Sequence, residues 1–329
     1  MKPFLYTIVI LFCDTGLFAQ QHYICIPASS PVKIDGILND EAWQKAQWTN
    51  DFVDITGSPS LTPKFKTRAK MIWDDQYLYI AAELEEPAVS AHYKNRDDLL
   101  FKENDFEVFI DPDGDANDYY ELEINALNTV MDLYLSKPYR SGGKALINWD
   151  AKGMKTAVHV SGTLNKPGDK DQGWTVEMAI PYSALSFMDN SVKPSNGSIW
   201  RMNFLRVEWD QEIKDGQYTI LKKPEHNWSW SPQGIVNMHL PERWGYVKFT
   251  TEASDTSFQL PASIKEEQVL WQVFIKEMMY RWQHQRFAQL AELELPDQPY
   301  KITLEATTIQ FEATINNLSV NQDGRLIRK

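Results

Sequence analysis

The sequence is poor in cysteine, with only Cys13 and Cys25 among its 329 residues. We expect Cys13 to leave with an N-terminal signal, so the mature chain keeps one cysteine and has no internal disulfide. A metal site built on cysteine ligands is therefore excluded. A catalytic thiol at Cys25 is disfavoured as well, because this residue lies in an apolar, strand-like stretch where a buried and inert thiol is the common outcome.

Basic residues are scarce relative to acidic ones: the chain has 33 Lys and Arg against 45 Asp and Glu, a formal net charge of −12. Nucleic acids and anionic membrane surfaces are poor partners for such a chain, because binding to them depends largely on Lys and Arg contacting phosphates. Long hydrophobic runs are also missing. After the N-terminus, no segment approaches the roughly 18 consecutive apolar residues of a membrane span, so membrane insertion is not expected.

The N-terminus has the pattern of an export signal over residues 1–19. Lys2 supplies the positive start, residues 4–12 form a short apolar run, and Ala19 offers a small residue before the cut. A lipid anchor on Cys13 is the weaker interpretation, because Phe12 is bulky for the position before a lipidated cysteine. We expect an exported protein that works in the periplasm, on the outer surface or outside the cell.

Residues 22–250 predict a mainly β fold. Short runs with alternating polar and apolar residues recur between turn signals, and the helical periodicity that a parallel α/β sheet requires is missing. We therefore expect an antiparallel β-sandwich of the jelly-roll kind. The predicted strands cover residues 66–73, 77–84, 106–111, 119–125, 130–135, 154–160, 174–180, 200–207 and 246–249.

The character of the chain changes after this region. A polar linker is expected at 251–262, an amphipathic helix at 263–295, and a short β extension at 296–329. Ser263 with Glu266 has the spacing of a capping box at the start of the helix. The apolar stripe of the helix is expected to dock on the core of the same chain; the alternative is a surface that joins the protein to an outer-surface assembly.

Acidic residues are concentrated in the stretch 104–125, which predicts two half-buried strands joined by a turn. Asp111, Asp113 and Asp115 in this turn resemble the start of a calcium-binding loop. The stretch does not match the helix-loop-helix calcium pattern, because Ala116 stands where glycine is needed and Leu122 where a glutamate is needed. Two interpretations remain open: a calcium site in a β-loop, or a solvated acidic turn.

Two later stretches supply further candidate ligand-binding residues. In the strand predicted at 200–207, Arg206 follows apolar residues of the same face, which fits a strand running from a core towards a binding rim. Trp228 and Trp230 either share one face of a strand or form a stacking wall in a loop. His239 is either a structural hydrogen-bonding group or a catalytic one. Trp149 and Asn203 complete the candidates.

The usual signatures of catalysis are missing from the sequence. It contains no G-x-S-x-G, no H-E-x-x-H and no glycine-rich phosphate loop. Two carboxylates are enough to hydrolyse a glycosidic bond, but 45 acidic residues leave such a pair undefined. No catalytic residue is assigned.

Several segments, in order, resemble the family 9 carbohydrate-binding modules over about residues 31–249. They are VKIDGILNDEAW (32–43), AKMIWDDQYLYIAAELEEP (69–87), NDFEVFIDPDGD (104–115), GWTVEMAIPYSAL (173–185) and WRMNFLRVEW (200–209). The resemblance implies an antiparallel β-sandwich with structural calcium. It also implies a slot that holds the end of a sugar chain between aromatic rings, with the reducing ends of plant glucans or xylans as the family's usual ligands.

The resemblance also implies roles for individual residues. Phe101 stands where the family has its first stacking tryptophan, Glu107 matches the ligand-contacting glutamate, and Asn125 matches an asparagine of the next strand. Glu123 replaces an arginine of the family. The second stacking ring has no unique match among Trp228, Trp230 and His239.

The leading hypothesis is an exported, non-catalytic carbohydrate-binding protein that supports polysaccharide capture or breakdown, with a glycan as its partner. One alternative is a glycoside hydrolase acting on O-glycosyl bonds in the same slot. Another is a haem-binding electron-transfer module on a related sandwich, in which Met202 and Met238 are candidate ligands.

Overall fold

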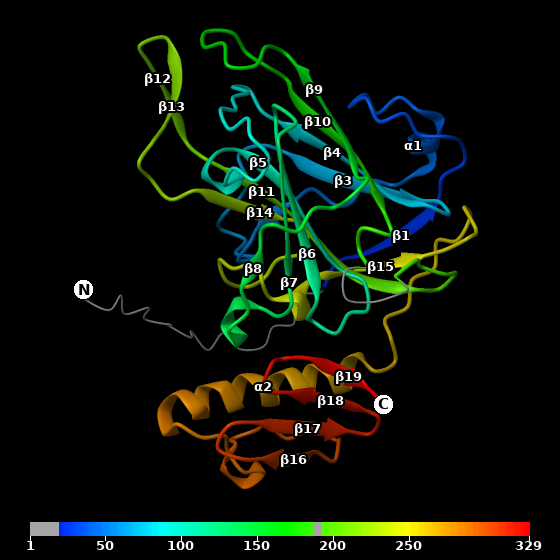
Figure 1. Ribbon diagram of the computed structural model, residues 1–329, viewed down its shortest axis with the longest axis vertical. Coiled ribbons are helices and arrows are strands. Elements are labelled where there is room, and N and C mark those ends of the chain that lie inside the picture. The colour runs from blue at the N-terminus through cyan, green and yellow to red at the C-terminus, as the bar shows by residue number, and fades with distance from the viewer. Residues whose placement is uncertain (1–19, 187–191) are drawn as a thin grey trace.

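The computed structural model describes residues 20–186 and 192–329. The signal peptide predicted at 1–19 therefore lies outside the described residues. A β-sandwich forms the larger part of the molecule, and a smaller C-terminal unit of one long helix and four strands lies against one end of it (Figure 1). The prediction of a mainly β fold with a sandwich, a C-terminal helix and a short β tail is confirmed.

Sheet A is the larger layer of the sandwich, with its central strands in the order β8-β7-β6-β5-β11-β15-β1. Short strands β14 and β2 extend it beside β11. Its strands are β1 (His22–Pro27), β2 (Val53–Asp54), β5 (Asp105–Asp111), β6 (Tyr119–Asn125), β7 (Val130–Leu135), β8 (Ala145–Leu146), β11 (Ile199–Glu208), β14 (His226–Ser229) and β15 (Gly245–Phe249).

Sheet B has the order β1-β3-β4-β10-β9. Besides the shared β1, its strands are β3 (Thr67–Trp73), β4 (Tyr77–Glu85), β9 (Lys155–Ser161) and β10 (Gly173–Pro181). Strand β1 belongs to both layers. Residues 22–25 pair with β15 of sheet A, whereas Ile26 and Pro27 pair with β3 of sheet B, and both pairings are parallel. The other pairings between named strands are antiparallel.

The core lies between the two sheets because apolar residues alternate along the strands. Sheet A contributes residues such as Phe106, Val108 and Phe204, and sheet B contributes Met71 and Ile80, all in one buried cluster. The alternate positions of β5 and β6 point to the outer face of sheet A. That outer face carries the candidate site described below.

The first segment of the chain covers the outer face of sheet B. Trp43 of helix α1 (Glu41–Lys45) is fully buried there, and its indole N–H donates to Glu177 Oε1 at 2.7 Å. Glu177 Oε2 accepts the backbone N–H groups of Asp35 and Gly36. Gly36 has φ +83°, and a Cβ there would lie 2.6 Å from the carbonyl carbon of Val158, so this close approach requires glycine.

The remaining short elements are the projecting hairpin β12 (Gln211–Lys214) and β13 (Gln217–Ile220) and the 3₁₀ turns η1 (Leu100–Lys102), η2 (Tyr139–Ser141), η3 (Pro241–Arg243) and η4 (Leu290–Glu292). None of the helices in the described ranges has both the length and the apolar character needed to cross a bilayer.

Helix α2 (Ile264–His284) ends eleven residues before the predicted end at 295. Gln285 adopts a left-handed conformation with φ +58°, and the chain turns back so that the N–H of Ala288 donates to Glu277 Oε2 at 2.8 Å. The expected capping box does not form either: the Ser263 side chain makes no cap hydrogen bond and instead donates to Glu267 Oε1 at 2.8 Å.

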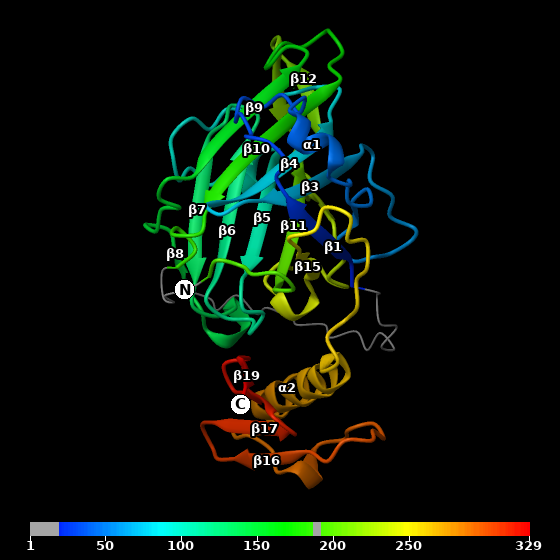
Figure 2. The same ribbon diagram turned by 90° about the vertical axis from the view of Figure 1, so that its right-hand side faces the viewer.

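The C-terminal sheet contains β16 (Thr303–Ala306), β17 (Phe311–Ile315), β18 (Leu318–Asn321) and β19 (Leu326–Arg328), paired in chain order. Leu270 and Phe274 of α2 are buried with Phe311 and Val320 of this sheet. Figure 2 shows α2 and β19 on the side that faces the sandwich, with β16 farther away. The apolar stripe of the helix is thus covered by the same chain, and its use in an outer-surface assembly stays a prediction.

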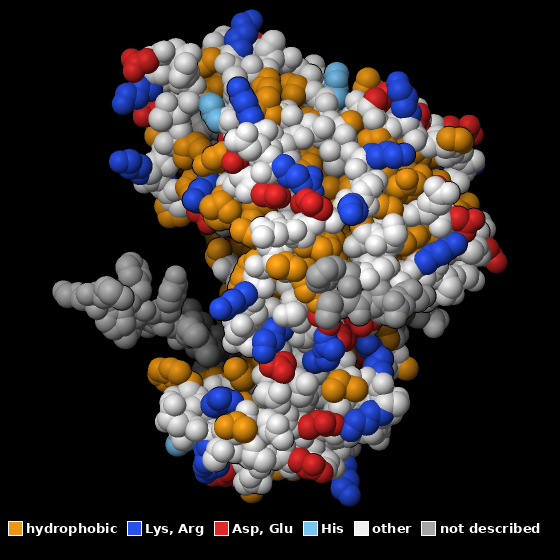
Figure 3. Space-filling model, in the orientation of Figure 1, with side chains coloured by type: hydrophobic (Ala, Val, Ile, Leu, Met, Phe, Trp, Pro, Cys, Tyr) orange, Lys and Arg blue, Asp and Glu red, His pale blue; other side chains and the backbone are white. Residues whose placement is uncertain are grey.

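The C-terminal unit contacts the sandwich through the acidic turn after β5. Arg325 forms ion pairs with Asp115 (3.2 Å) and with Asp118, and Arg328 donates to the carbonyl oxygen of Asp113 at 3.0 Å. Figure 3 shows Lys and Arg side chains along this junction. The acidic turn therefore lies against the positively charged end of the chain.

Candidate functional site

Acidic side chains gather on the outer face of sheet A. Strands β5 and β6 are antiparallel, and Glu107 stands opposite Glu123 in their register. Because side chains alternate between faces, Asp105 and Glu107 of β5 share the outer face with Glu121 and Glu123 of β6. All four are buried, and carboxylate oxygens of Asp105, Glu107 and Glu123 lie within 4.8 Å of one another.

This environment raises the pKa of the carboxyl groups. Burial is the main cause for Asp105, Glu107 and Glu121, and repulsion from neighbouring carboxylates raises their pKa values further. Burial raises the pKa of Glu123 to about 7, although the N–H of Phe101, which donates to Glu123 Oε2 at 3.2 Å, acts in the opposite direction.

Aromatic side chains flank this group. Towards the Glu123 end of β6, Phe101 of η1 is 41% exposed, and its carbonyl oxygen accepts the indole N–H of Trp209 at 3.0 Å. Towards the Glu121 end, Tyr139 is 46% exposed and packs edge-on against His239, with 4.4 Å between ring centroids. Two accessible rings thus stand at the sides of the carboxylates.

His239 covers part of the same face. Its Nδ1 lies 3.0 Å from the hydroxyl of Tyr119, and its Nε2 lies 3.9 Å from Glu121 Oε2. Burial lowers the pKa of His239 to about 4, so the ring is neutral at pH 7. It therefore adds a hydrogen-bonding group to the site and no positive charge.

Asn125 and Asn203, predicted as sugar ligands, instead hold loops. Asn125 donates to the carbonyl of Tyr93 and to Glu103 Oε1, and its oxygen accepts two backbone N–H groups of the following turn. Asn203 donates to the carbonyl of Ser231 and accepts its N–H. With both residues fully buried, the expectation that they face a ligand is wrong for this structure.

Arg206 lies on the opposite face of sheet A, between the two sheets. Its guanidinium pairs with Glu86 (2.7 Å) and Glu208 (2.8 Å) and donates to the carbonyl oxygen of Glu85 and the hydroxyl of Thr67. The arginine is buried and ties sheet B to sheet A. The prediction that it reaches a sugar at the rim is therefore wrong.

The three candidate tryptophans are core residues. Trp149, Trp228 and Trp230 are all buried in the cluster between the sheets. The ring of Trp228 lies 5.1 Å from the guanidinium carbon of Arg206, and Trp149 packs against Tyr120 with 4.9 Å between centroids. Of the two alternatives for Trp228 and Trp230, the stacking wall does not exist, because both rings fill the interior.

The predicted calcium residues Asp111, Asp113 and Asp115 also bring their oxygens within 4.8 Å of one another. This spacing fits a small cation. Asp111, however, accepts the N–H groups of Gly114 and Ala116, both at 2.9 Å, and Asp115 is paired with Arg325. The turn thus has internal partners for much of its charge, and calcium binding there stays a prediction.

The haem alternative does not fit the two methionines proposed for it. Met202 is buried in the core between the sheets, whereas Met238 belongs to the apolar cluster on the outer face of sheet A. A sheet separates the two sulfur atoms, so they cannot ligate one haem together.

Sequence reasoning did not select Asp105, Glu121, Tyr139 or Trp209. The first two had a usable signal, since acidic residues alternate in both strands around the turn and must share one face. Nothing in the sequence pattern pointed to Tyr139 or Trp209, because only the folded chain brings their loops to sheet A.

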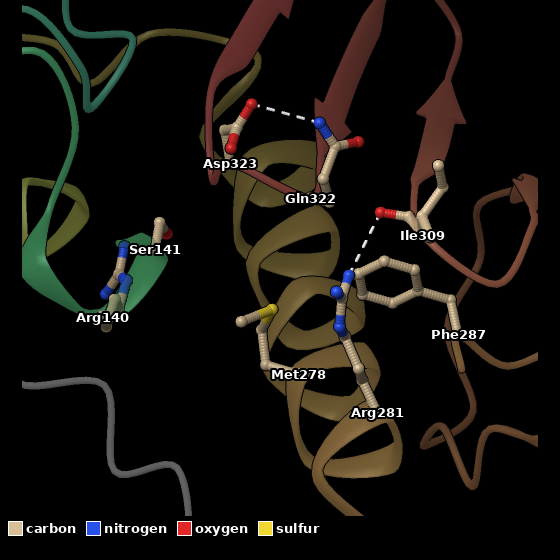
Figure 4. A pocket seen from close by; sticks show the side chains of 8 residues that line it. All are labelled: Arg140, Ser141, Met278, Arg281, Phe287, Ile309, Gln322 and Asp323. Carbon is tan, nitrogen blue, oxygen red and sulfur yellow. Dashed lines mark hydrogen bonds between the residues drawn. The ribbon is translucent and has the colours of Figure 1, made fainter. Parts of the chain in front are cut away.

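Two cavities lie elsewhere. One of about 440 Å³ lies at the junction with the C-terminal unit, and Figure 4 shows Arg140 and Ser141 of η2 opposite Met278 and Arg281 of α2. The other, of about 400 Å³, lies on the outer face of sheet B, where Arg68 and Glu83 form an ion pair. Neither is lined by Phe101 or Glu107.

The similarity to known proteins lies in the β-sandwich. Residues 34–250 match the family described as carbohydrate family 9 binding domain-like. The chain is 26% identical over 159 residues to exoglucanase XynX of Acetivibrio thermocellus, which is 48% of this chain and 12% of that protein. It is 28% identical over 166 residues to endo-1,4-beta-xylanase A of Thermoanaerobacterium saccharolyticum, which is 50% of this chain and again 12% of the relative.

A crystal structure of a protein from Bacteroides uniformis shares the fold. It has a TM-score of 0.51 and 17% identity, and covers 70% of this chain and 99% of the other. The sequence match spans both sheets of the sandwich and leaves the C-terminal unit outside. On this basis the chain belongs to the carbohydrate family 9 binding domain-like family.

Proposed function

We propose that this protein binds carbohydrate without chemical turnover, on the outer face of sheet A between Phe101 and the Tyr139–His239 pair. The observation that carries the proposal is Phe101, which is 41% exposed and whose backbone N–H donates to Glu123, the residue opposite Glu107. Membership of a carbohydrate-binding family supports the same conclusion.

The chemistry suits a sugar. An aromatic ring stacks on the C–H face of a pyranose, and carboxylate oxygens accept hydrogen bonds from its hydroxyl groups. Phenylalanine offers a smaller face than tryptophan, and a shallow site gains little from burial, so we expect affinities of roughly micromolar to millimolar. The names of the relatives point to β-linked glucan and xylan fragments as the first ligands to examine.

Calorimetry with a panel of gluco- and xylo-oligosaccharides tests the proposal. Phe101→Ala and Tyr139→Ala are expected to weaken binding at least about tenfold, the loss of roughly 1.4 kcal/mol. Trp282→Ala is the matched control, because this ring is 78% exposed but lies on α2. Failure of every glycan to bind, or equal binding by the wild type and all three variants, would refute the proposal.

The hydrolase alternative has one supporting observation, the short distances among the carboxylates of Asp105, Glu107 and Glu123. Retaining glycosidases place two carboxyl groups about 5–5.5 Å apart. Turnover of a chromogenic glycoside that disappears in Glu107→Gln would establish that alternative. Binding without turnover supports the proposed function.

Three further features belong to the proposal. The protein acts after export, which N-terminal sequencing of the mature chain tests by locating a cut after Ala19.

Calcium bound by Asp111, Asp113 and Asp115 competes with Arg325 for the acidic turn. Ile275 and Trp282 are the exposed apolar residues of α2 through which an assembly would form.

A further inference from the structure

The acidic group on sheet A has no positive partner. Asp105, Glu107, Glu121 and Glu123 are all buried, and no ion pair within the described ranges joins any of them to Lys or Arg. Among residues 20–186 and 192–329, the one basic side chain paired with the group is His239, at 3.9 Å from Glu121 Oε2. The protein therefore supplies no Lys or Arg that would stabilise these carboxyl groups in their ionised form.

Asp105 is the most deeply buried member of the acidic group. It is 0% exposed, and neither of its carboxylate oxygens makes a well-formed hydrogen bond, although the backbone N–H of Val207 interacts with the carboxyl group. Glu121 Oε2 is buried without a partner as well. Buried polar atoms are nearly always paired, because losing water without a replacement is costly, and a carboxylate is costlier than a neutral group. These orphaned oxygens point to a ligand.

Other buried carboxylates of the chain show the contrast. Glu177 accepts an indole N–H and two backbone N–H groups. Asp132 pairs with Arg96 and accepts the N–H of Ala151 at 2.6 Å. In the acidic turn, Asp111 accepts two backbone N–H groups. These three buried carboxylates therefore each accept hydrogen bonds from donors of the protein. The acidic group on β5 and β6 contains buried carboxylate oxygens that do not.

The geometry fits a metal ion. Calcium takes oxygen ligands at about 2.3–2.6 Å, so two oxygens on opposite sides of one ion are about 5 Å apart. One oxygen each from Asp105, Glu107 and Glu123 meets this limit, since all lie within 4.8 Å of one another. We propose that these three side chains bind a hard divalent cation, calcium in the first instance, with Glu121 beside it.

The position of the ligands supports a preformed site. Asp105 and Glu107 lie two residues apart on β5, and Glu123 lies directly opposite Glu107 on β6. Both strands are interior in sheet A, so the backbone that carries the ligands is held on both sides. The cation lies next to Phe101, and a sugar hydroxyl there would meet a metal ion as well as carboxylates.

Calorimetric titration of calcium into chelator-treated full-length protein tests the inference without any sugar. The expected result is a binding isotherm in the wild type whose affinity falls at least about tenfold in Glu123→Gln and in Asp105→Asn. Glu305→Gln, at an exposed position of β16, is the matched control, and Asp113→Asn reports separately on calcium binding by the acidic turn. Magnesium serves as the competing probe.

A second measurement guards against variants that simply misfold. Glu123→Gln removes one of the mutually repelling buried carboxyl groups, so its metal-free melting temperature is expected to rise above that of the wild type, while the increase that calcium gives the wild type disappears. A wild type with neither an isotherm nor a calcium-dependent shift would overturn the inference. So would calcium binding that Asp113→Asn abolishes and Glu123→Gln leaves unchanged. Loss of glycan binding alone refutes the proposed function and leaves the cation site standing.

Discussion

The side chains of Glu107 and Arg206 lie on opposite faces of sheet A, although their strands are hydrogen-bonded neighbours. Arg206 stands opposite Phe106 in the register, and Phe106 points into the core. Glu107, one residue later, therefore points outward. The single-residue offset separates two roles: Glu107 belongs to the candidate site, and Arg206 joins the two layers of the sandwich.

Replacing Arg206 should destabilise the fold strongly. Arg206→Ala leaves Glu86 and Glu208 buried without their partner, and removal of one member of a buried ion pair typically costs about 3–5 kcal/mol. Arg68→Ala, which breaks the exposed ion pair with Glu83, should cost less than about 1 kcal/mol. Urea unfolding of both variants compares the two, and equal losses would contradict the structural role given to Arg206.

Trp228 and Phe101 should show opposite behaviour in stability and binding. Trp228 is buried in the main core, so Trp228→Ala is expected to cost about 3–5 kcal/mol. Phe101→Ala, at an exposed position, should change stability by no more than about 0.5 kcal/mol while weakening glycan binding. Thermal unfolding and calorimetry on the same preparations measure both quantities, and a stable Trp228→Ala that fails to bind sugar would reverse the assignment.

The stability of the C-terminal unit should fall as pH rises. Burial raises the pKa of Glu277 from 4.5 to about 7, so the folded state holds this proton more tightly than the unfolded state. The stabilisation is complete below the unfolded pKa and is lost as pH rises through 7, by on the order of 3 kcal/mol at most. Urea unfolding followed by helical circular dichroism reports α2.

Two variants isolate that effect. Glu277→Gln should remove most of the difference in stability between about pH 5 and about pH 8. Glu305→Gln, at an exposed position of β16, should leave the difference intact. A pH dependence that survives in Glu277→Gln would assign it to another group.

The attachment of the C-terminal unit should depend on salt. Arg325→Ala combined with Arg328→Ala removes the contacts with Asp113, Asp115 and Asp118, and exposed pairs are worth about 0.2–1 kcal/mol each. Faster proteolysis within 251–262 is the expected result, with high salt bringing the wild type towards the variant. Lys329→Ala, which breaks a pair with Glu312 inside the unit, is the control and should be cut at the wild-type rate.

Much of the sandwich could be predicted from the alternation of polar and apolar residues and from the turn residues between the strands. The predicted bounds of β6 and β7 coincide with those observed, because both strands alternate cleanly between well-marked turns. The end of α2 could not be predicted, since it depends on Glu277 capturing the N–H of Ala288 after the chain has turned. The acid turn was predicted, but not its contact with Arg325, which comes from 210 residues later in the sequence.

The site was predicted less well than the fold, for a physical reason. Alternation assigns residues to the two faces of a strand but does not say which loops cover each face. Trp228 and Trp230 look like exposed ligand rings in a polar stretch. The pairing of β14 with β11 instead turns Trp228 inward, and Trp230, directly after β14, is buried in the same core. Glu107 and Phe101 were identified through the family resemblance, whereas Tyr139 reaches the face only through tertiary packing.

The parallel pairing of β1 with β15 limits how early the sandwich can fold during synthesis. Residues 22–25 find their sheet A partner only in β15, where His22 pairs with Tyr246 and Cys25 with Phe249. The first strand of the sandwich thus pairs with nearly the last, and the two layers cannot close before the chain has been synthesised as far as residue 249. Pairing between residues so distant in the sequence also slows folding.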